Sequence, residues 1–219
     1  MSVQLSTLIN EVMPDVIGVP YPLVEMELRK ILVDFCHKTF IINEGFKKDV
    51  LSTDPASPNN HIDIATPAAY AEYMPCHIMR LTIDGVDYDT EERKITSDLT
   101  DINSIVDSTE TKLWYASTAT NIIMYPFEAI AAQLYLKVAF KPTMSITSLD
   151  DLFYQDYHDD IVAGTKANLM VMPKKSWTDM QSAANYRSDY IKGRNSALIT
   201  IINSIEKEVK QRANSKSFL

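Results

Sequence analysis

The residues best suited to chemistry form one acidic stretch. They are Asp150, Asp151, Asp156, His158, Asp159 and Asp160. Carboxylates and imidazoles bind divalent cations, and a helix would bring Asp156 and Asp160 onto one face because they are four residues apart. No flanking loop supplies further ligands in a recognised order. We therefore interpret the stretch as a solvated acidic helix face and predict no metal site.

The four histidines, His37, His61, His77 and His158, are the candidate general bases. A catalytic base needs a nucleophile and an orienting group beside it, and neither Gly-x-Ser-x-Gly nor His-Glu-x-x-His occurs. Cys36 precedes His37, but adjacent residues of a helix point in different directions. Cys36 is interpreted as a small core residue, and we predict no catalytic residue, no cofactor and no enzymatic activity.

The composition narrows the classes of protein further. Of 219 residues, 46% are hydrophobic, which is enough for a packed core. The formal net charge of −8 argues against wrapping nucleic acid, because that requires a basic surface. Two cysteines do not make a disulfide scaffold, and 5 glycines argue against a glycine-rich phosphate loop. The sequence shows neither a signal peptide nor an apolar run long enough to span a membrane.

Helical patterns occupy the N-terminal part of the chain. Residues 3–13 carry an apolar stripe of Leu5, Leu8, Ile9 and Val12. After a proline-rich loop, a second helix is expected from about Pro22, with an apolar and a polar face. The expected apolar face comprises Val24, Leu28, Ile31, Leu32 and Phe35. The expected polar face comprises Glu25, Glu27, Arg29, Lys30 and Lys38.

The middle of the chain has β character. Strands are expected at Ile78–Ile83, 113–116 and 122–125, and residues 54–60 and 89–108 are expected to be loops. Asp84-Gly85 followed by Val86 is the best hairpin signal. Residues 133–140 alternate, which predicts a strand with one buried face that ends at Pro142. We expect a small antiparallel sheet or barrel.

The C-terminal part is again helical. Helices are expected over about 149–172 and from about Ser176 to Gln211, each opened by a capping box starting at Ser148 or Ser176. The first should bury Phe153, Tyr157 and Ile161. The second carries a longer apolar stripe of Met180, Ala183, Tyr186, Tyr190, Ala197, Ile201, Ile205 and Val209. Gly193 lies inside it and predicts a close helix–helix contact.

These patterns predict an α+β fold. Helices from both chain ends would form an antiparallel bundle, with a small antiparallel β module inserted between them. The expected divisions are an N-terminal helical hairpin (1–41), a β-rich insertion (42–142), the C-terminal helices (143–211) and a flexible tail (212–219). The expected bundle core comprises Leu28, Phe35, Tyr157, Ile161, Trp177 and Tyr190. For Trp177, core packing is preferred to an interface anchor.

Two segments resemble the head–tail adaptor (head completion) proteins of tailed bacteriophages. The first runs from Gly18 to Val24 and continues through Leu28-Arg29 to the stretch Asp34–Thr39, which contains the Phe35-Cys36 pair. The second begins at Leu152 and resembles the family in the order of Tyr157, Ile161, Gly164, Met172-Pro173, Ser176-Trp177, Ala183-Ala184, Tyr186, Tyr190 and Gly193. Thr165 and Ser176 depart from the Ala and Pro common there. The matches cover roughly a third of the chain.

The resemblance implies a structural role without chemistry. It implies a homo-oligomeric ring of about a dozen copies in the virion neck, assembled in the host cytoplasm. The ring would dock under the portal protein, contact a tail or nozzle protein, and pass DNA without specific binding and without a membrane. By analogy, a C-terminal arm would dock on the portal. Its predicted docking residues are Lys207, Lys210, Arg212, Lys216, Phe218 and Leu219.

Three other functions stay open at this point. A neck stopper or tail-completion protein belongs to the same class and differs in contacting the tail tube. A small hydrolase or host-targeting effector would need a pocket with converging titratable groups. A monomeric regulatory binding module would show one large apolar patch. For the basic tail residues, DNA contact, docking on an acidic partner and simple solvation are all compatible with the sequence.

Overall fold

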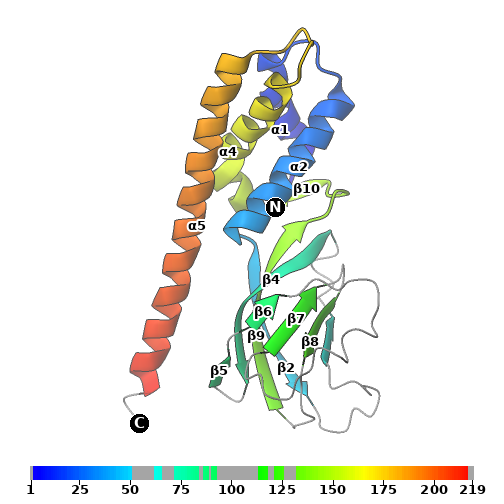
Figure 1. The fold of residues 1–219 in the computed structure, drawn as a ribbon. Helices are drawn as coiled ribbons and strands as arrows, with labels where there is room; N and C mark the ends of the chain where they lie inside the picture. Colours follow the sequence, from blue (N-terminus) through cyan, green and yellow to red (C-terminus); the bar gives the residue numbers. More distant parts are fainter. Residues whose placement is uncertain are drawn as a thin grey trace. The chain divides into compact units, whose positions relative to one another are not determined.

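The computed structural model describes residues 2–50, 62–65, 72–83, 86–88, 90–92, 113–117, 121–125 and 132–216 (Figure 1). The fold is α+β. It divides into two compact units. The helical unit comprises Met1–Ile41 with Pro142–Leu219, and the β unit comprises Ile42–Lys141.

The N-terminal segment of the helical unit follows its apolar pattern closely. It contains β1 (Ser2–Gln4), α1 (Leu5–Val12), η1 (Met13–Asp15) and α2 (Tyr21–Thr39). The stripe predicted for the first helix is confirmed, because its four residues are all buried. β1 pairs antiparallel with β10 (Ser148–Asp150), which places Val3 opposite Leu149. This pairing, which the helical pattern does not predict, joins the two chain ends at the start of the unit.

The apolar face predicted for α2 is also confirmed, and Val24, Leu28, Ile31, Leu32 and Phe35 are all buried. The prediction for the polar face is wrong at Glu27, which is 6% exposed. Its carboxylate accepts hydrogen bonds from Lys30 Nζ at 2.6 Å and from Asn168 Nδ2 at 3.2 Å. A buried carboxylate is tolerated when it is paired in this way.

Both predicted capping boxes are wrong in their first residue. α4 spans Asp151–Met170, and its N-cap is Asp150, whose Oδ1 accepts a hydrogen bond from Leu152 N at 2.9 Å. α5 spans Met180–Lys216, and Asp179 Oδ1 accepts from the backbone N–H groups of Gln181 and Ser182, both at 3.1 Å. Aspartate and serine are both good N-cap residues. In each case the helix begins after an aspartate that follows the predicted serine in the chain.

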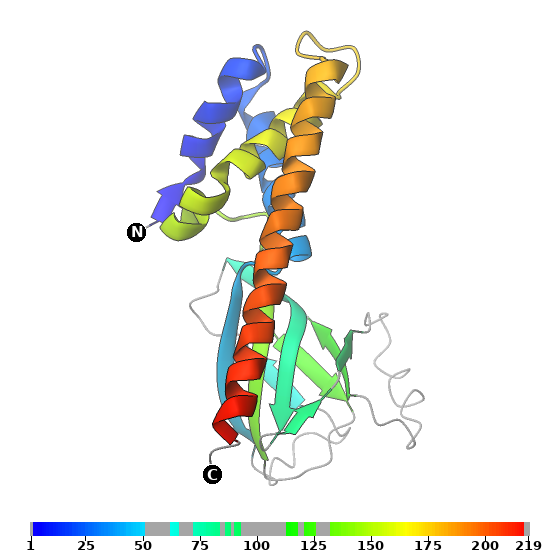
Figure 2. The same cartoon turned by 90° about the vertical axis from the view of Figure 1, so that its left-hand side faces the viewer.

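α5 runs alongside α4 and continues past it (Figure 2). It has 37 residues against 20 in α4, a difference worth about 25 Å at 1.5 Å per residue. Ala183, Tyr190 and Ala197 are buried, but Met180 is 62% exposed, which corrects the start of the predicted stripe. The helix ends at Lys216, so residues 212–216 are helical where a free tail was expected.

The prediction of a close contact at Gly193 is confirmed. A Cβ on Gly193 would overlap the Asp160 carboxylate of α4. A second glycine, Gly164 of α4, has the same role on the other side of the crossing. A Cβ there would lie 2.8 Å from Cδ2 of Tyr190 and 3.0 Å from Cγ2 of Ile31. The two glycines let α4 pack closely against α5 and α2.

The first sheet of the β unit has the strand order β2-β9-β4-β5. Its strands are β2 (Asn43–Val50), β9 (Ala132–Pro142), β4 (Tyr73–Ile83) and β5 (Val86–Tyr88). The predicted hairpin is confirmed by the antiparallel pairing of Ile83 with Val86. The predicted strand within β9 also forms, but burial extends to Lys137 and Ala139 as well, so the prediction of a single buried face is wrong there.

The second sheet has the order β3-β8-β7-β6. Its strands are β3 (Ile62–Ala65), β8 (Asn121–Tyr125), β7 (Leu113–Ser117) and β6 (Thr90–Glu92). β6 lies in the expected loop 89–108 and pairs parallel with β7, which is a departure from the expected antiparallel module. The loop expected at 54–60 lies outside the described residues. β4 lies against β6 and β7, which connects the two sheets.

Within the part of the chain that the structure describes, no helix combines the length and apolar character needed to cross a membrane.

Candidate functional site

Four aromatic rings form the centre of the helical unit. Phe35 of α2 lies 6.1 Å from Phe153 and 5.4 Å from Tyr157 of α4, and 6.2 Å from Tyr190 of α5, measured between ring centroids. Tilted and edge-to-face pairs at such distances add to the free energy gained by burial. The rings therefore bring three helices, from both ends of the chain, around one point.

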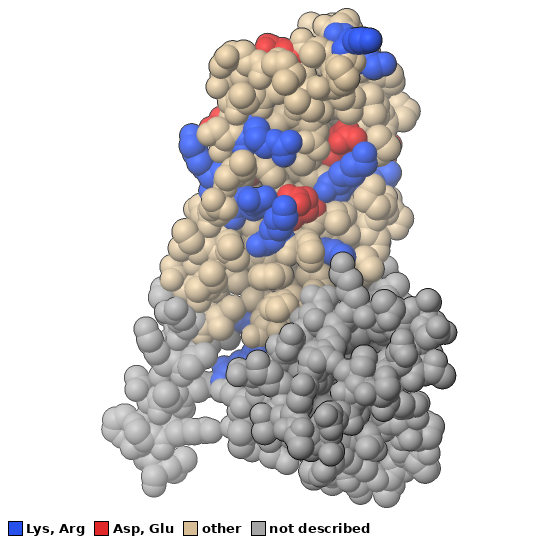
Figure 3. Space-filling view, viewed as in Figure 1, with Lys and Arg blue, Asp and Glu red and all other residues tan. Residues whose placement is uncertain are grey.

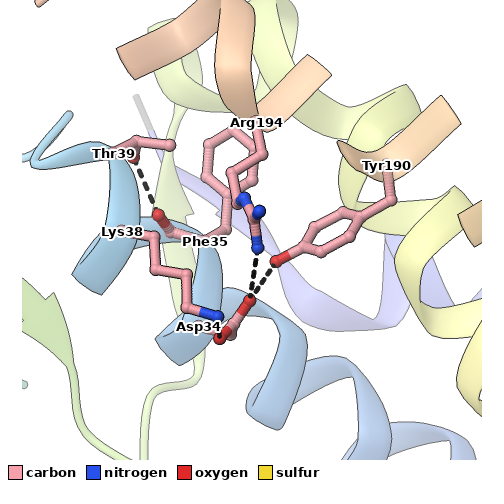
Figure 4. A network of polar contacts seen from close by, with 6 residues as sticks. All are labelled: Asp34, Phe35, Lys38, Thr39, Tyr190 and Arg194. Atoms are coloured by element: carbon pink, nitrogen blue, oxygen red, sulfur yellow. Dashed lines mark hydrogen bonds and ion pairs between the residues drawn. The ribbon is translucent and has the colours of Figure 1, made fainter. Parts of the chain in front are cut away.

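Asp34 connects two of these helices, α2 and α5, by polar contacts (Figure 4). Its carboxylate accepts a hydrogen bond from Tyr190 Oη at 2.7 Å and lies 2.9 Å from Lys38 Nζ and 3.6 Å from Arg194 Nη1. Burial acts to raise the pKa of Asp34, but the hydrogen bonds and charges of its three partners outweigh it and lower the pKa. Burial and the Asp34 carboxylate together raise the pKa of Tyr190, so its hydroxyl stays a donor.

Asp15 forms a second link between the chain ends. Its carboxylate is paired with Lys166 of α4 and accepts a hydrogen bond from Tyr186 Oη of α5 at 3.3 Å. The hydrogen bond from Lys166 is the main reason why the pKa of Asp15 is lowered. Lys166 Nζ also lies 5.4 Å from the centroid of the Tyr186 ring. This contact holds the turn after α1 against the two C-terminal helices.

The same arrangement recurs in two further pairs. Glu27 accepts from Asn168, and Glu11 accepts from Tyr154 Oη at 2.7 Å. In all four cases the carboxylate comes from the N-terminal segment and at least one donor comes from the C-terminal helices. These four polar contacts therefore join the N-terminal segment to the C-terminal helices.

The acidic stretch at the start of α4 is spread around the helix. Asp160 faces α5 and lies against Gly193, whereas Asp159 is 93% exposed on its side chain. Burial, followed by the nearby Asp159 carboxylate, raises the pKa of Asp160. Among the residues that the structure describes, no group of three His, Cys, Asp or Glu side chains is arranged to hold a metal ion.

The candidate bases do not converge either. Cys36 is fully buried in α2, whereas the neighbouring His37 is exposed, so their side chains point in different directions. His158 lies on α4, where its Nδ1 is 3.1 Å from the Tyr154 carbonyl oxygen and its Nε2 is 3.4 Å from Asp159 Oδ1. His77 is half-buried on β4, and His61 lies outside the described residues.

Of the residues expected in the bundle core, Leu28, Phe35, Ile161 and Tyr190 are buried, and Tyr157 and Trp177 are half-buried. Trp177 lies in the connection between α4 and α5, and Lys175 Nζ is 5.8 Å from its ring centroid. The indole Nε1 is buried and has no hydrogen-bond partner in the described part of the protein. The contact of Trp177 within this connection is thus made by its ring, with the Lys175 ammonium.

Several large apolar residues are exposed on the helical unit. On α5 they are Ile191, Ile199 and Ile202, next to the half-exposed Leu198, Ile201 and Ile205. Met180, the first residue of α5, is exposed as well, and elsewhere on the helical unit Ile17, Leu152 and Val171 are exposed. Large apolar side chains grouped on a surface are typical of association sites.

The residues expected to dock on a portal lie at the end of the chain. Lys207, Lys210, Arg212 and Lys216 lie on the last turns of α5, and Phe218 and Leu219 lie outside the described residues. Their docking role stays a prediction.

Sequence reasoning missed the polar links between the chain ends. The pairs Asp34–Lys38 and Tyr190–Arg194 are each four residues apart, so the sequence shows that each shares a helix face. No pattern within one helix reveals that these two faces meet, because that depends on the packing of α2 against α5.

No model of a known protein family matches this chain, and no curated protein sequence matches it.

Proposed function

We propose that this chain is a structural adaptor subunit from the head–tail junction of a tailed bacteriophage. In this proposal the helices of both chain ends form an antiparallel bundle, and the β unit is a module inserted into it. Copies of the chain close a ring of about a dozen subunits in the virion neck, beneath the portal protein. The ring extends the DNA channel and contacts a tail or nozzle protein.

One observation carries this proposal. The sequence resembles phage adaptors in the order of Gly164, Tyr190 and Gly193, and these three residues form the tight crossing of α4 and α5. Residues that resemble the family therefore coincide with residues that the packing requires. This supports a common architecture, from which the function is inferred by analogy.

The arrangement of polar groups supports a role without chemistry. Asp15, Asp34 and Glu27 each accept hydrogen bonds from another helix, so their carboxylates are occupied in holding helices together. Such pairs give the helical unit a fixed geometry, which is what a ring-forming wedge needs. The remaining exposed apolar residues supply contact area for neighbours.

The direct test is assembly with a portal. The full chain is mixed with the purified portal ring of the phage that encodes it, and the complex is examined by native mass spectrometry and cryo-electron microscopy. The proposal predicts a ring of about a dozen copies on one end of the portal. Binding to a tail tube without the portal would support a neck stopper instead, and turnover of a substrate by a monomer would contradict both.

A matched pair of variants sharpens this test. We expect K210E/R212E to weaken portal binding at least about tenfold, because it reverses charges in the predicted docking arm. R187E/K192E makes the same change in charge on exposed residues of α5 outside that arm, and it should bind as the unaltered chain does. Equal binding by both variants would contradict the docking role of the arm.

A further inference from the structure

One end of the helical unit combines exposed apolar residues with lysines. Val16 and Val19 are buried and hold the turn before α2, so Ile17 between them is 79% exposed. This turn is adjacent to the connection between α4 and α5, because a Cβ on Gly18 would lie 3.3 Å from Ser176 Oγ. The two loops therefore form one surface, which we call the basic end.

The connection between α4 and α5, together with the first residue of α5, supplies the rest of the basic end. Val171 and Met180 are exposed apolar residues, and Lys174 and Lys175 are exposed between them in the chain. Figure 3 shows a group of basic side chains at this end of the unit. We define the basic end as Ile17, Val171, Lys174, Lys175 and Met180.

Within the described part of the chain, two acidic residues lie at the basic end, and only one of them has a cationic partner. Asp15 is paired with Lys166 and accepts from Tyr186, and Asp179 accepts from the first backbone N–H groups of α5. The side-chain and backbone hydrogen bonds from Ser182 lower the pKa of Asp179. Asp179 therefore stays ionised, whereas Asp15 is balanced by Lys166. The two charges of Lys174 and Lys175 exceed the single negative charge of Asp179 and make this surface positive.

The opposite end of α4 has the complementary character. Leu152 is 71% exposed in the first turn, and acidic residues surround it in the sequence. We define this acidic end as Asp150, Asp151, Leu152, Asp156 and Asp159. At 1.5 Å per residue, the 20 residues of α4 separate the two ends by about 30 Å.

We propose that the basic end of one copy of this chain docks on the acidic end of the next copy, with Ile17 and Leu152 at the centre of the contact. The inference deepens the proposed function, since it names the surfaces that would join neighbouring subunits. Two different surfaces on one unit make a head-to-tail contact, which closes into a ring when the rotation between copies permits.

The charge balance favours a second copy as the occupant. Two chains with a formal net charge of −8 repel each other on average, so their association needs a local surface of opposite sign. The basic end provides one, and the acidic end provides its complement within the same chain. Complementary charges of this kind set the orientation of partners and raise their association rate.

A charge swap tests this contact without any portal. Self-association of the full chain is measured by sedimentation velocity at low salt and up to about 1 mM protein, so that a weak contact is detected. K174E/K175E and D156K/D159K should each weaken self-association at least about tenfold. An equimolar mixture of the two variants, and the chain carrying all four changes, should both restore it, because the charges are complementary again.

Matched controls separate this contact from general charge effects. R187E/K192E changes the net charge by the same amount as K174E/K175E on another face, and it should leave self-association unchanged. L152S and I17S remove the apolar centre without changing the charge, and each should weaken association several-fold. Thermal unfolding of each variant verifies that the fold is kept.

Three results would overturn the inference. They are an unaltered chain that stays monomeric throughout, a charge reversal without effect, or a swap that fails to restore association. Portal binding is a separate measurement. If the charge swap restores self-association but no portal complex forms, the proposed function is removed and this contact remains. If the portal complex forms but the charge swap fails, this contact alone is removed.

Discussion

The first and second halves of α5 differ in how their side chains are buried. In residues 180–197, Ala183, Tyr190 and Ala197 are buried at seven-residue intervals, and Tyr190 and Arg194 contact Asp34. In residues 198–205, no described side chain is buried, although four of these residues are isoleucines. Residues 180–197 are part of the core, whereas residues 198–205 present apolar surface. Substitutions in the first half should change stability, and those in the second half should change association.

The largest expected effect is at Tyr190, which is 1% exposed. Tyr190→Ala should lower the free energy of unfolding by about 4 kcal/mol, because it leaves a cavity and removes the hydrogen bond to Asp34. Ile202→Ala in the second half should change it by less than about 0.5 kcal/mol. Urea unfolding measures both values, and similar losses for the two variants would contradict the comparison.

A smaller effect is expected at Gly193. Gly193→Ala should cost about 1–2 kcal/mol, since the new Cβ displaces the Asp160 carboxylate. In the Asp160→Ala background the same substitution should become neutral or stabilising, because alanine favours the helix by about 1 kcal/mol. A double-mutant cycle measures the coupling. Additive effects would show that Asp160 and Gly193 do not touch.

The Asp34 contact should make stability depend on acidity. Its folded-state pKa is lowered, so the contact stabilises the protein above the unfolded pKa and the stability is lost as pH falls through the folded pKa. Asp34→Asn should lower the free energy of unfolding by about 1 kcal/mol near pH 7 and by less in acid. The expected loss is modest because the carboxylate is partly exposed to solvent. Unfolding free energies measured from pH 7 to pH 3 test this, and a pH-independent cost would refute it.

Asp160 should show the opposite sign. Its pKa is raised in the folded protein, chiefly by burial, so its contribution is most favourable below the unfolded pKa and declines as pH rises through the folded pKa. Asp160→Asn should therefore gain stability relative to the unaltered chain on going from acid to neutral pH. Comparing Asp160→Asn with Asp34→Asn over the same pH range is the control, since their trends should be opposite.

The sequence predicted the helices well because their apolar residues recur at helical spacing. The stripes of α1 and α2 needed no information beyond the chain itself. The caps were harder. Ser148 and Asp150 both suit an N-cap, and the choice between them depends on β10 pairing with β1, which lies far away in the sequence. For Glu27, a partner on α4 changed a predicted surface residue into a buried one.

The β unit shows the limit of local patterns. The hairpin at Asp84-Gly85 was predictable because its turn residues adjoin both strands. β2 contains Lys47, Lys48 and Asp49 and lacks alternation, and it forms as a partner of β9 across more than 80 residues of chain. β6 forms similarly by pairing with β7. Strands that depend on distant partners carry little signal of their own.

The same reasoning applies to the candidate surfaces. The acidic residues around Leu152 were visible in the sequence, but they were interpreted as a solvated helix face. The basic end was not visible as a unit, because Ile17 and Lys174 are far apart in the chain and meet through the contact of Gly18 with Ser176. A surface that combines residues of two loops can be recognised only when the fold is known.

Amide hydrogen exchange along α5 tests the account most directly. In the free chain, amides of residues 183–197 should exchange at least about a hundredfold more slowly than those of 198–205, because no side chain of 198–205 is buried and helical segments without tertiary packing open readily. Adding the portal ring should slow exchange in 203–216 and leave 183–197 nearly unchanged. Uniform protection of α5 in the free chain, or a portal that leaves residues 203–216 unprotected, would contradict the account.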